Sequence, residues 1–154
     1  MSLDEFFRIG TTVTLGSHRF EPEEIKAFAR KYDPQVFHVD EEAAKNSVLG
    51  GLCASGWHTA ATWMKLNLET RMGGEWAGPG PAPEFGPSPG FKNLKWLKPV
   101  FAGETVTFNR TALSHRPISS RSGWRLLSLR SEAFDSTGDK VLEFESAVLV
   151  KVGE

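Results

Sequence analysis

The stretch GLCASGWHTAATWMKLNL, residues 51–68, decides the fold that the sequence predicts. From Gly56 onward its apolar residues recur at helical spacing and cover most of the helix circumference. One apolar face would hold Trp57, Ala60, Ala61, Met64 and Leu68. A helix that is apolar on most of its sides is normally buried. We therefore expect a central helix that the rest of the chain encloses.

Elements on both sides of this helix predict an α+β fold with an antiparallel sheet. A strand at 11–15, a helix over 21–33 and a short turn or helix near 40–46 precede it. Residues 73–90 hold six glycines and five prolines, which predicts a long loop. Four strand-like segments follow, at 91–97, 104–115, 123–135 and 140–151. Helices early and strands late are typical of α+β domains, and this length predicts a single domain over 1–154.

Composition argues against several classes of protein. The 18 basic and 19 acidic residues give a net charge of −1 without a long run of one sign, so a nucleic-acid or anionic-membrane surface is not expected. Cys53 is the only cysteine, and the four histidines lack metal-ligand spacing, so neither a disulfide nor a bound metal or cofactor is expected. No signal peptide and no apolar run of about 18 residues occurs. We expect a cytoplasmic protein without a membrane span.

Asp33 and His38 are the residues that the sequence most favours for chemistry. Five positions apart, they would point about 140° away from each other on a helix and lie on opposite faces of a strand. They converge only if the backbone turns between them, and Pro34 favours such a turn because it disfavours helical geometry at Asp33. From the residues alone, Asp33 could equally cap a turn and His38 could be an ordinary surface or core histidine.

Small residues lie directly before the central helix, at 51–56. Free N–H groups at a helix start bind developing negative charge, and small side chains let a ligand approach the backbone. The alternative is that the glycines only let the helix enter the core closely. Ser55 lacks the flanking glycines of a nucleophile elbow, and Cys53 is more typical of a small buried apolar residue than of a thiol nucleophile.

Three stretches of the chain resemble the MaoC-like dehydratases, a family that includes the (R)-specific enoyl-CoA hydratases. The first runs from Phe28 to Ala44 and contains Asp33 and His38. The second is GGL at 50–52 followed by ASGWH at 54–58. The third runs from Ser88 to Glu104 and contains the segment WLKPV. Their order and spacing also match the family, which makes the set more specific than any one stretch.

This resemblance implies a hot-dog fold, in which an antiparallel sheet of about five strands wraps around a long central helix. It implies that Asp33 and His38 activate water, and that the N–H of Gly56, 18 residues past His38, holds the thioester oxygen. Ser55 and Trp57, on either side of Gly56, are expected to bind substrate. The family's commoner asparagine-proline motif is absent between the acid and the histidine, which leaves the substrate preference open.

The function that the resemblance implies is that of a hydro-lyase of fatty acid metabolism. It would interconvert a 2-enoyl-CoA and a 3-hydroxyacyl-CoA, and it would act as a homodimer or higher homo-oligomer. Candidate cations for the CoA phosphates are Lys92, Lys95, Lys98, Arg116, Arg121 and Arg125. One alternative is an acyl-CoA thioesterase, although the predicted inward helix face offers no carboxylate. A second alternative is a non-catalytic acyl-CoA-binding module, which would need neither Asp33 nor His38.

Overall fold

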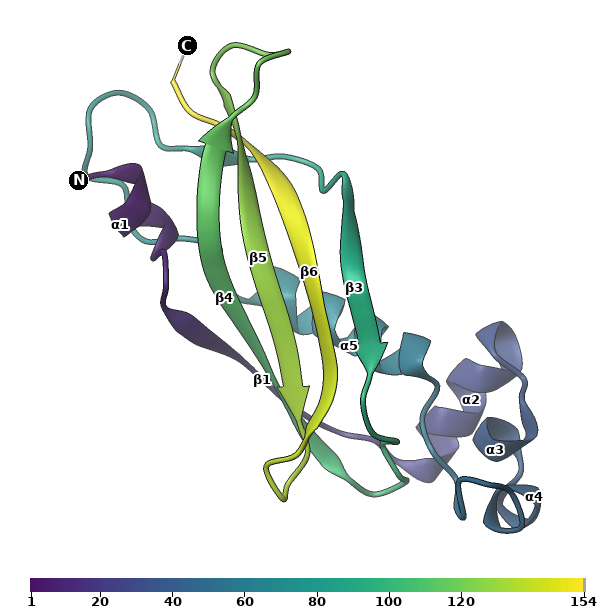
Figure 1. Ribbon diagram of the computed structural model, residues 1–154. Coiled ribbons are helices and arrows are strands. Elements are labelled where there is room, and N and C mark those ends of the chain that lie inside the picture. Colours follow the sequence, from purple (N-terminus) through teal and green to yellow (C-terminus); the bar gives the residue numbers. More distant parts are fainter. Residues whose placement is uncertain (154) are drawn as a thin grey trace.

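A curled antiparallel sheet wraps around one long helix, as expected for a hot-dog fold (Figure 1). The computed structural model describes residues 1–153. The sheet consists of β1 (Thr12–Arg19), β3 (Gly90–Trp96), β4 (Thr105–Pro117), β5 (Trp124–Phe134), β6 (Lys140–Lys151) and the two-residue β2 (Glu84–Phe85). The helices are α1 (Leu3–Phe7), α2 (Pro22–Tyr32), α3 (Val36–Val39), α4 (Glu41–Lys45) and α5 (Gly56–Glu69). The predicted fold is confirmed.

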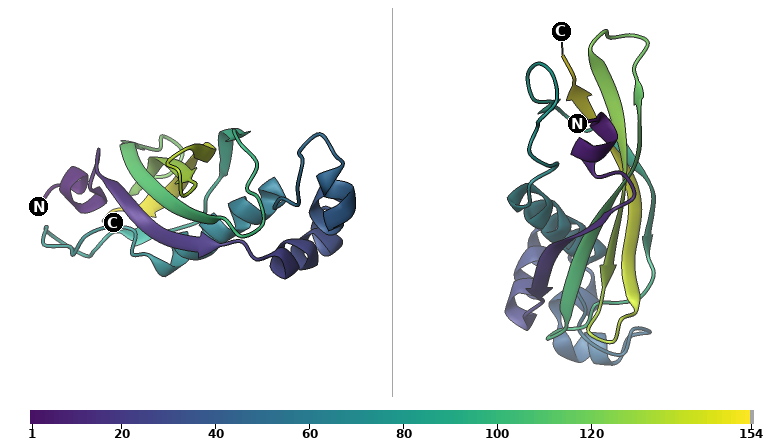
Figure 2. Two further views of the ribbon diagram at one scale, coloured as in Figure 1. Left: turned by 90° about the horizontal axis from the view of Figure 1, so that it is seen from below. Right: turned by 90° about the vertical axis from the view of Figure 1, so that its left-hand side faces the viewer.

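The sheet is ordered β1-β4-β5-β6, and both β2 and β3 pair with β6. All helices lie on one side of the sheet or beyond its ends, and α5 lies along the concave face (Figure 2). Three helices, α2, α3 and α4, gather beyond the end of β3, where α5 begins (Figure 1). That corner of the molecule brings the first half of the chain against the start of the central helix.

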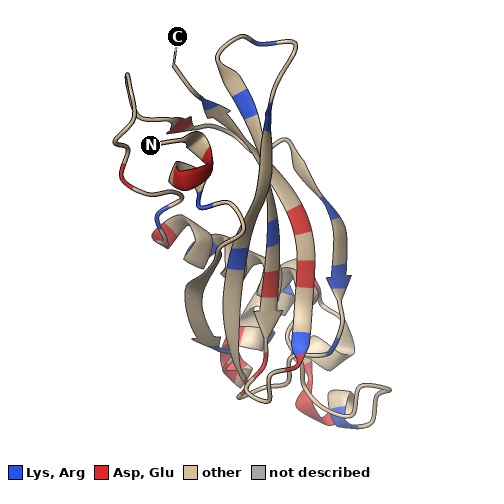
Figure 3. Ribbon diagram, turned by 60° about the vertical axis from the view of Figure 1, so that its left-hand side comes forward, with Lys and Arg blue, Asp and Glu red and all other residues tan. Residues whose placement is uncertain are grey.

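Opposite charges face each other across three neighbouring strands. Lys92 lies opposite Glu145, and Lys95 lies opposite Glu143, between β3 and β6. On the other side of β6, Arg130 of β5 also lies opposite Glu145. Basic and acidic segments consequently alternate across this part of the sheet (Figure 3). These three opposite-charge pairs favour the observed register. Glu132 faces Glu143 in the same register, and Lys140 bonds both carboxylates.

The buried side of α5 is not the side that the apolar pattern predicts. Trp57, Met64 and Leu68 are 50%, 46% and 76% exposed. The buried residues of the helix are His58, Thr59, Thr62, Trp63 and Asn67. The predicted inward face was therefore wrong.

Hydrogen bonds make the burial of these polar residues possible. The Thr59 hydroxyl donates to the Gly56 carbonyl at 2.7 Å, and the Thr62 hydroxyl donates to the His58 carbonyl at 2.8 Å. Asn67 Oδ1 accepts from the buried Arg110 guanidinium at 2.6 Å. A buried polar group loses its contacts with water, and a hydrogen bond within the protein offsets most of that cost. The spacing of apolar residues in the sequence gives no information about such hydrogen-bond partners.

The main core lies between α5 and the sheet. Its largest fully buried side chains include Phe20, Ile25 and Phe108. Trp63 fixes α5 to β6, because its indole packs edge-to-face against Phe144 at 4.7 Å between ring centroids. Within residues 1–153, no helix is both long and apolar enough to cross a lipid bilayer.

We expect Trp63→Ala to lower the free energy of unfolding by about 3–5 kcal/mol, because it removes a buried ring and leaves a cavity. Urea denaturation monitored by circular dichroism measures this loss. Leu68→Ala, on the same helix but 76% exposed, is the matched control and should cost far less. Equal losses in the two variants would contradict the observed orientation of α5.

Candidate active site

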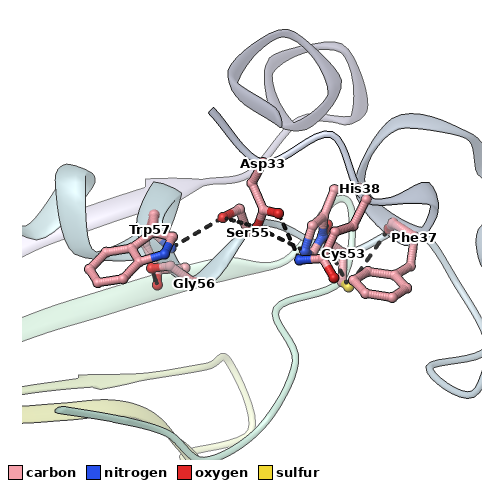
Figure 4. Close-up of polar contacts among 9 residues, drawn as sticks. Asp33, Phe37, His38, Cys53, Ser55, Gly56 and Trp57 are labelled. Carbon is pink, nitrogen blue, oxygen red and sulfur yellow. Dashed lines mark hydrogen bonds and ion pairs between the residues drawn. The ribbon is translucent and has the colours of Figure 1, made fainter. Parts of the chain in front are cut away.

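The break between α2 and α3 brings Asp33 and His38 together, as the sequence predicts. Helix α2 ends at Tyr32, and Asp33 follows with φ −154° and ψ 67°, outside the helical region. Pro34 accounts for this end, and the short helix α3 then turns His38 back. His38 Nε2 lies 3.4 Å from Asp33 Oδ2 (Figure 4). The two side chains converge across the turn.

Both oxygens of the Asp33 carboxylate accept hydrogen bonds. The Ser55 hydroxyl donates to Oδ2, and the Gln35 amide donates to Oδ1, each at 2.7 Å. An ionised carboxylate accepts at both oxygens, so these two donors suit the charged form. They also fix the plane of the carboxylate at the mouth of the turn.

A backbone carbonyl sets the orientation of His38. Its Nδ1 lies 2.6 Å from the carbonyl oxygen of Cys53. A carbonyl oxygen only accepts, so Nδ1 carries the proton and donates it. In the neutral ring, Nε2 then presents its lone pair toward Asp33. Two acceptors 3.4 Å apart do not bond each other directly, but one water molecule can donate a hydrogen to each.

The first N–H of α5 lies beside this pair. Ser55 precedes the helix and its hydroxyl accepts from the Trp57 N–H at 3.2 Å. The Gly56 N–H makes no hydrogen bond within residues 1–153. Trp96 covers the other side of Gly56, since a Cβ added there would overlap its indole ring. A free N–H at a helix start is a good site for a developing oxyanion.

A cleft of about 480 Å³ joins Asp33, His38 and Gly56. Its apolar walls include Phe37, Leu49, Trp57, Trp96, Leu97, Pro99 and Val100. The Trp57 and Trp96 rings pack edge-to-face with centroids 5.0 Å apart. A mostly apolar cleft with a few converging polar groups is typical of a small-molecule site.

Two other residues in this region already have polar partners within the protein. Ser55, expected to bind substrate, is fully buried, and its hydroxyl lies behind Asp33 rather than in the cleft wall. Lys98, a candidate for a CoA phosphate, lies 2.7 Å from Asp135 and 2.8 Å from Asp139. Those two carboxylates raise the pKa of Lys98, so its ammonium group stays charged and is already paired with them, although Lys98 lines the cleft.

The Cys53 thiol is an unsuitable nucleophile. Burial and, to a smaller extent, the nearby Asp33 carboxylate together raise its pKa to about 11. The thiol therefore stays protonated at neutral pH, and a protonated thiol is a poor nucleophile. Its backbone carbonyl, which holds His38, is the part of Cys53 that shapes the site.

Sequence reasoning missed two residues that shape the site. Gln35 donates to Asp33, and Trp96 packs on Gly56 from 40 positions further along the chain. A glutamine two residues after the aspartate is a weak signal, since Asx-type turns often have polar neighbours. The Trp96 contact depends on the strand register, which no local pattern specifies.

We expect Gly56→Ala to displace the Trp96 indole and to destabilise the protein by about 1–3 kcal/mol, the usual cost of overpacking. Urea denaturation and tryptophan fluorescence measure the two effects. Gly51→Ala is the control, because an added Cβ there would meet the Phe101 ring at an ordinary 3.5 Å. In a Trp96→Ala background the cost of Gly56→Ala should fall, and an undiminished cost would contradict the contact.

Comparison with known proteins places this geometry in a family. YdeM of Bacillus subtilis (strain 168), described as an uncharacterized protein, is 30% identical over 151 residues, which are 98% of this chain and 99% of YdeM. The crystal structure of a MaoC-like dehydratase from Rhodospirillum rubrum is 33% identical, with a TM-score of 0.79 over 97% of this chain and 98% of its own.

Two more distant structures share the fold. The (R)-hydratase of A. caviae involved in PHA biosynthesis is 23% identical, with a TM-score of 0.66 over 94% of this chain and 96% of its own. A HadBC (3R-hydroxyacyl-ACP dehydratase) complex from Mycobacterium tuberculosis has 16% identity and a TM-score of 0.67, over 92% of this chain and 96% of its own. Residues 6–121 match the MaoC like domain family. The chain therefore belongs to the MaoC-like domain family.

Proposed function

We propose that this protein catalyses the reversible hydration of a 2-enoyl thioester to a 3-hydroxyacyl thioester. The observation that carries the proposal is the convergence of three groups on one cleft: the Asp33 carboxylate, the His38 imidazole and the free N–H of Gly56. The first two can hold a water molecule, and the third can hold an oxygen that gains charge. Hydration of an enoyl thioester needs both.

Water would bind between His38 Nε2 and Asp33 Oδ2. As its oxygen bonds to C3 of the substrate, one water proton passes to the Nε2 lone pair. The electron pair of the C2–C3 double bond moves to form an enolate, whose oxygen accepts from the Gly56 N–H. The protonated His38 then returns the proton to C2, which completes the addition of one water. Asp33 orients the water and stabilises the imidazolium.

His38 is the first proton acceptor in this scheme because the Asp33 oxygens already accept from Ser55 and Gln35. The neutral Nε2 has no such donor within residues 1–153. Dehydration follows the same steps in reverse. The names of the A. caviae (R)-hydratase and of the HadBC dehydratase are consistent with this chemistry on the same fold.

Thioester hydrolysis on the same fold has less support. The buried face of α5 carries His58, Thr59, Thr62, Trp63 and Asn67, and none of these is a carboxylate. Glu69, the last residue of the helix, is exposed. A purely binding module would not need an imidazole and a carboxylate placed to share one water.

We expect Asp33→Asn and His38→Ala each to lower kcat for hydration of crotonyl-CoA by about 10²–10⁴-fold, the usual contribution of a general acid or base. Loss of the enoyl absorbance measures the rate. His115→Ala is the control, since His115 does not line the cleft, and it should keep wild-type turnover. Wild-type rates in both site variants would refute the mechanism. Release of free CoA thiol, assayed in parallel, would favour a thioesterase instead.

We also propose that the protein acts as a homodimer. Exposed apolar side chains lie on α5 and on β3 with the residue that follows it, and we call this set the apolar face: Trp57, Met64, Leu68, Phe91, Trp96 and Leu97. Met64, Leu68 and Phe91 line one hollow, while the other three line the cleft. Apolar residues gathered on one face of a chain mark an interaction surface. Among the strands within residues 1–153, β3 pairs with β6 alone, so its other edge is open to a second strand. The HadBC structure, with the same fold, is a complex of chains.

We expect Leu68→Glu to weaken self-association by at least about tenfold, because it places a charge within this apolar face. Sedimentation equilibrium over a range of concentrations measures the dissociation constant. Val48→Glu is the matched control: Val48 is 96% exposed but lies outside the face, so the same change there should have no effect. Equal effects of the two substitutions would exclude this face as the interface.

A further inference from the structure

A cluster of two histidines and one glutamate lies outside the cleft and has no part in the chemistry described above. Oε1 of Glu24, in the first turn of α2, lies 3.0 Å from His58 Nε2 and 2.6 Å from His18 Nε2. His58 belongs to the first turn of α5, and His18 belongs to β1. Since a carboxylate oxygen accepts, both imidazoles donate through Nε2. The cluster therefore joins three elements through one oxygen.

Two aromatic rings pack against His58. Its ring stacks on Phe28 of α2, with centroids 4.6 Å apart and planes 8° apart. Phe20 contacts it edge-on at 5.0 Å. The second ring nitrogen, Nδ1, is buried and has no hydrogen-bond partner within residues 1–153. A side chain buried with one nitrogen unsatisfied is costly, which invites a reason beyond packing.

The position of α2 supplies that reason. Its two ends are attached to the same short segment of chain, where α5 begins. At the first turn, Glu24 bonds His58, and immediately past the last turn, Asp33 accepts from Ser55. The two attachments are separated by about 14 Å along α2. With the first released, the bond between Ser55 and Asp33 is the hydrogen bond that still ties α2 to α5 within residues 1–153, so the helix could rotate about it and change the angle at which the Asp33 carboxylate faces His38.

We propose that His58 is a positioning residue, which holds α2 against α5 through Glu24 and thereby fixes Asp33 beside His38. This inference rests on the proposed function wherever the rate of hydration is used to detect a change in the placement of Asp33. His58 itself touches no part of the cleft. It acts on the reaction through the placement of a helix.

The protonation state of His58 follows from the same surroundings. Burial lowers its pKa, while the Glu24 carboxylate opposes that effect and the neighbouring His18 adds to it. Glu24 and His18 are the titratable groups that face it. A proton on Nδ1 would be a buried donor without an acceptor. The unfolded chain therefore takes up this proton first, at a pH near the ordinary histidine pKa of about 6.5. The stability that neutral His58 contributes is complete above that pH and is lost as the pH falls below it.

Two substitutions at one position test the proposal. His58→Leu removes the donor, and we expect kcat for crotonyl-CoA hydration to fall about tenfold, equivalent to about 1.4 kcal/mol, with KM changed less than about twofold. His58→Gln keeps a donor near Nε2 and should recover most of kcat. Thr62→Val is the control, since Thr62 is buried on the same face but bonds only its own helix backbone. A wild-type kcat in His58→Leu, or an equal loss in Thr62→Val, would overturn the proposal.

A measurement without substrate separates this inference from the proposed function. Long-range proton–nitrogen NMR spectra report the tautomer and titration of each histidine. We expect wild-type His58 to be the neutral Nε2–H form at pH 7, and His58→Leu to shift the His38 Nε2 resonance because the Asp33 carboxylate beside it turns. An unchanged His38 Nε2 resonance would refute the positioning role. If wild-type protein hydrated no enoyl thioester but the shift occurred, the proposed function would fail and the positioning role would stand.

The unfolding free energy gives a third test, with a defined sign. Between about pH 6.5 and pH 5, wild-type protein should lose stability more steeply than His58→Gln, because glutamine does not titrate. Urea denaturation at several pH values measures both slopes. His18→Gln is the control, because His18 is the other histidine that bonds Glu24. Identical slopes in wild type and His58→Gln would contradict a buried neutral His58.

Discussion

The Ser55 hydroxyl links two parts of the chain that lie 22 positions apart. It donates to the Asp33 carboxylate and accepts from the Trp57 N–H, so one oxygen atom both caps α5 and holds the end of α2. The placement of the acid beside the oxyanion donor follows from this link. Asp33 is fixed relative to the helix whose first N–H is free, and His38 is fixed relative to Asp33 by the turn at Pro34. Without the link, Asp33 would no longer be tied directly to the start of the helix that carries the oxyanion donor.

Local signals in the sequence predicted much of the fold. The helix over 21–33 ends one residue from the predicted position, because a proline restricts the residue before it whatever the tertiary context. The four late strands also lie close to their predicted ranges, since β-branched and aromatic runs between turn residues depend little on the rest of the chain. The two-residue β2 was not predicted, because it exists only through its pairing with the end of β6.

Features that depend on distant partners could not be predicted. The buried side of α5 depends on the hydrogen-bond partners of Thr62 and Asn67, and one of those partners, Arg110, is on another element. Asp33 and His38 were identified by resemblance, and spacing alone could say only that the backbone must turn. The Trp96 contact with Gly56 required the sheet to be assembled.

The isolated β-bridge between Cys53 and Phe101 has an evolutionary consequence. It fixes the backbone at position 53, and it is a backbone oxygen there that determines which nitrogen of His38 is free. No amino-acid replacement at position 53 deletes that oxygen. The residue at position 53 can therefore change without changing the tautomer of His38. The new side chain need only be small enough for the buried space. Lineages could exchange the cysteine for another small residue and keep the histidine ready to accept a proton.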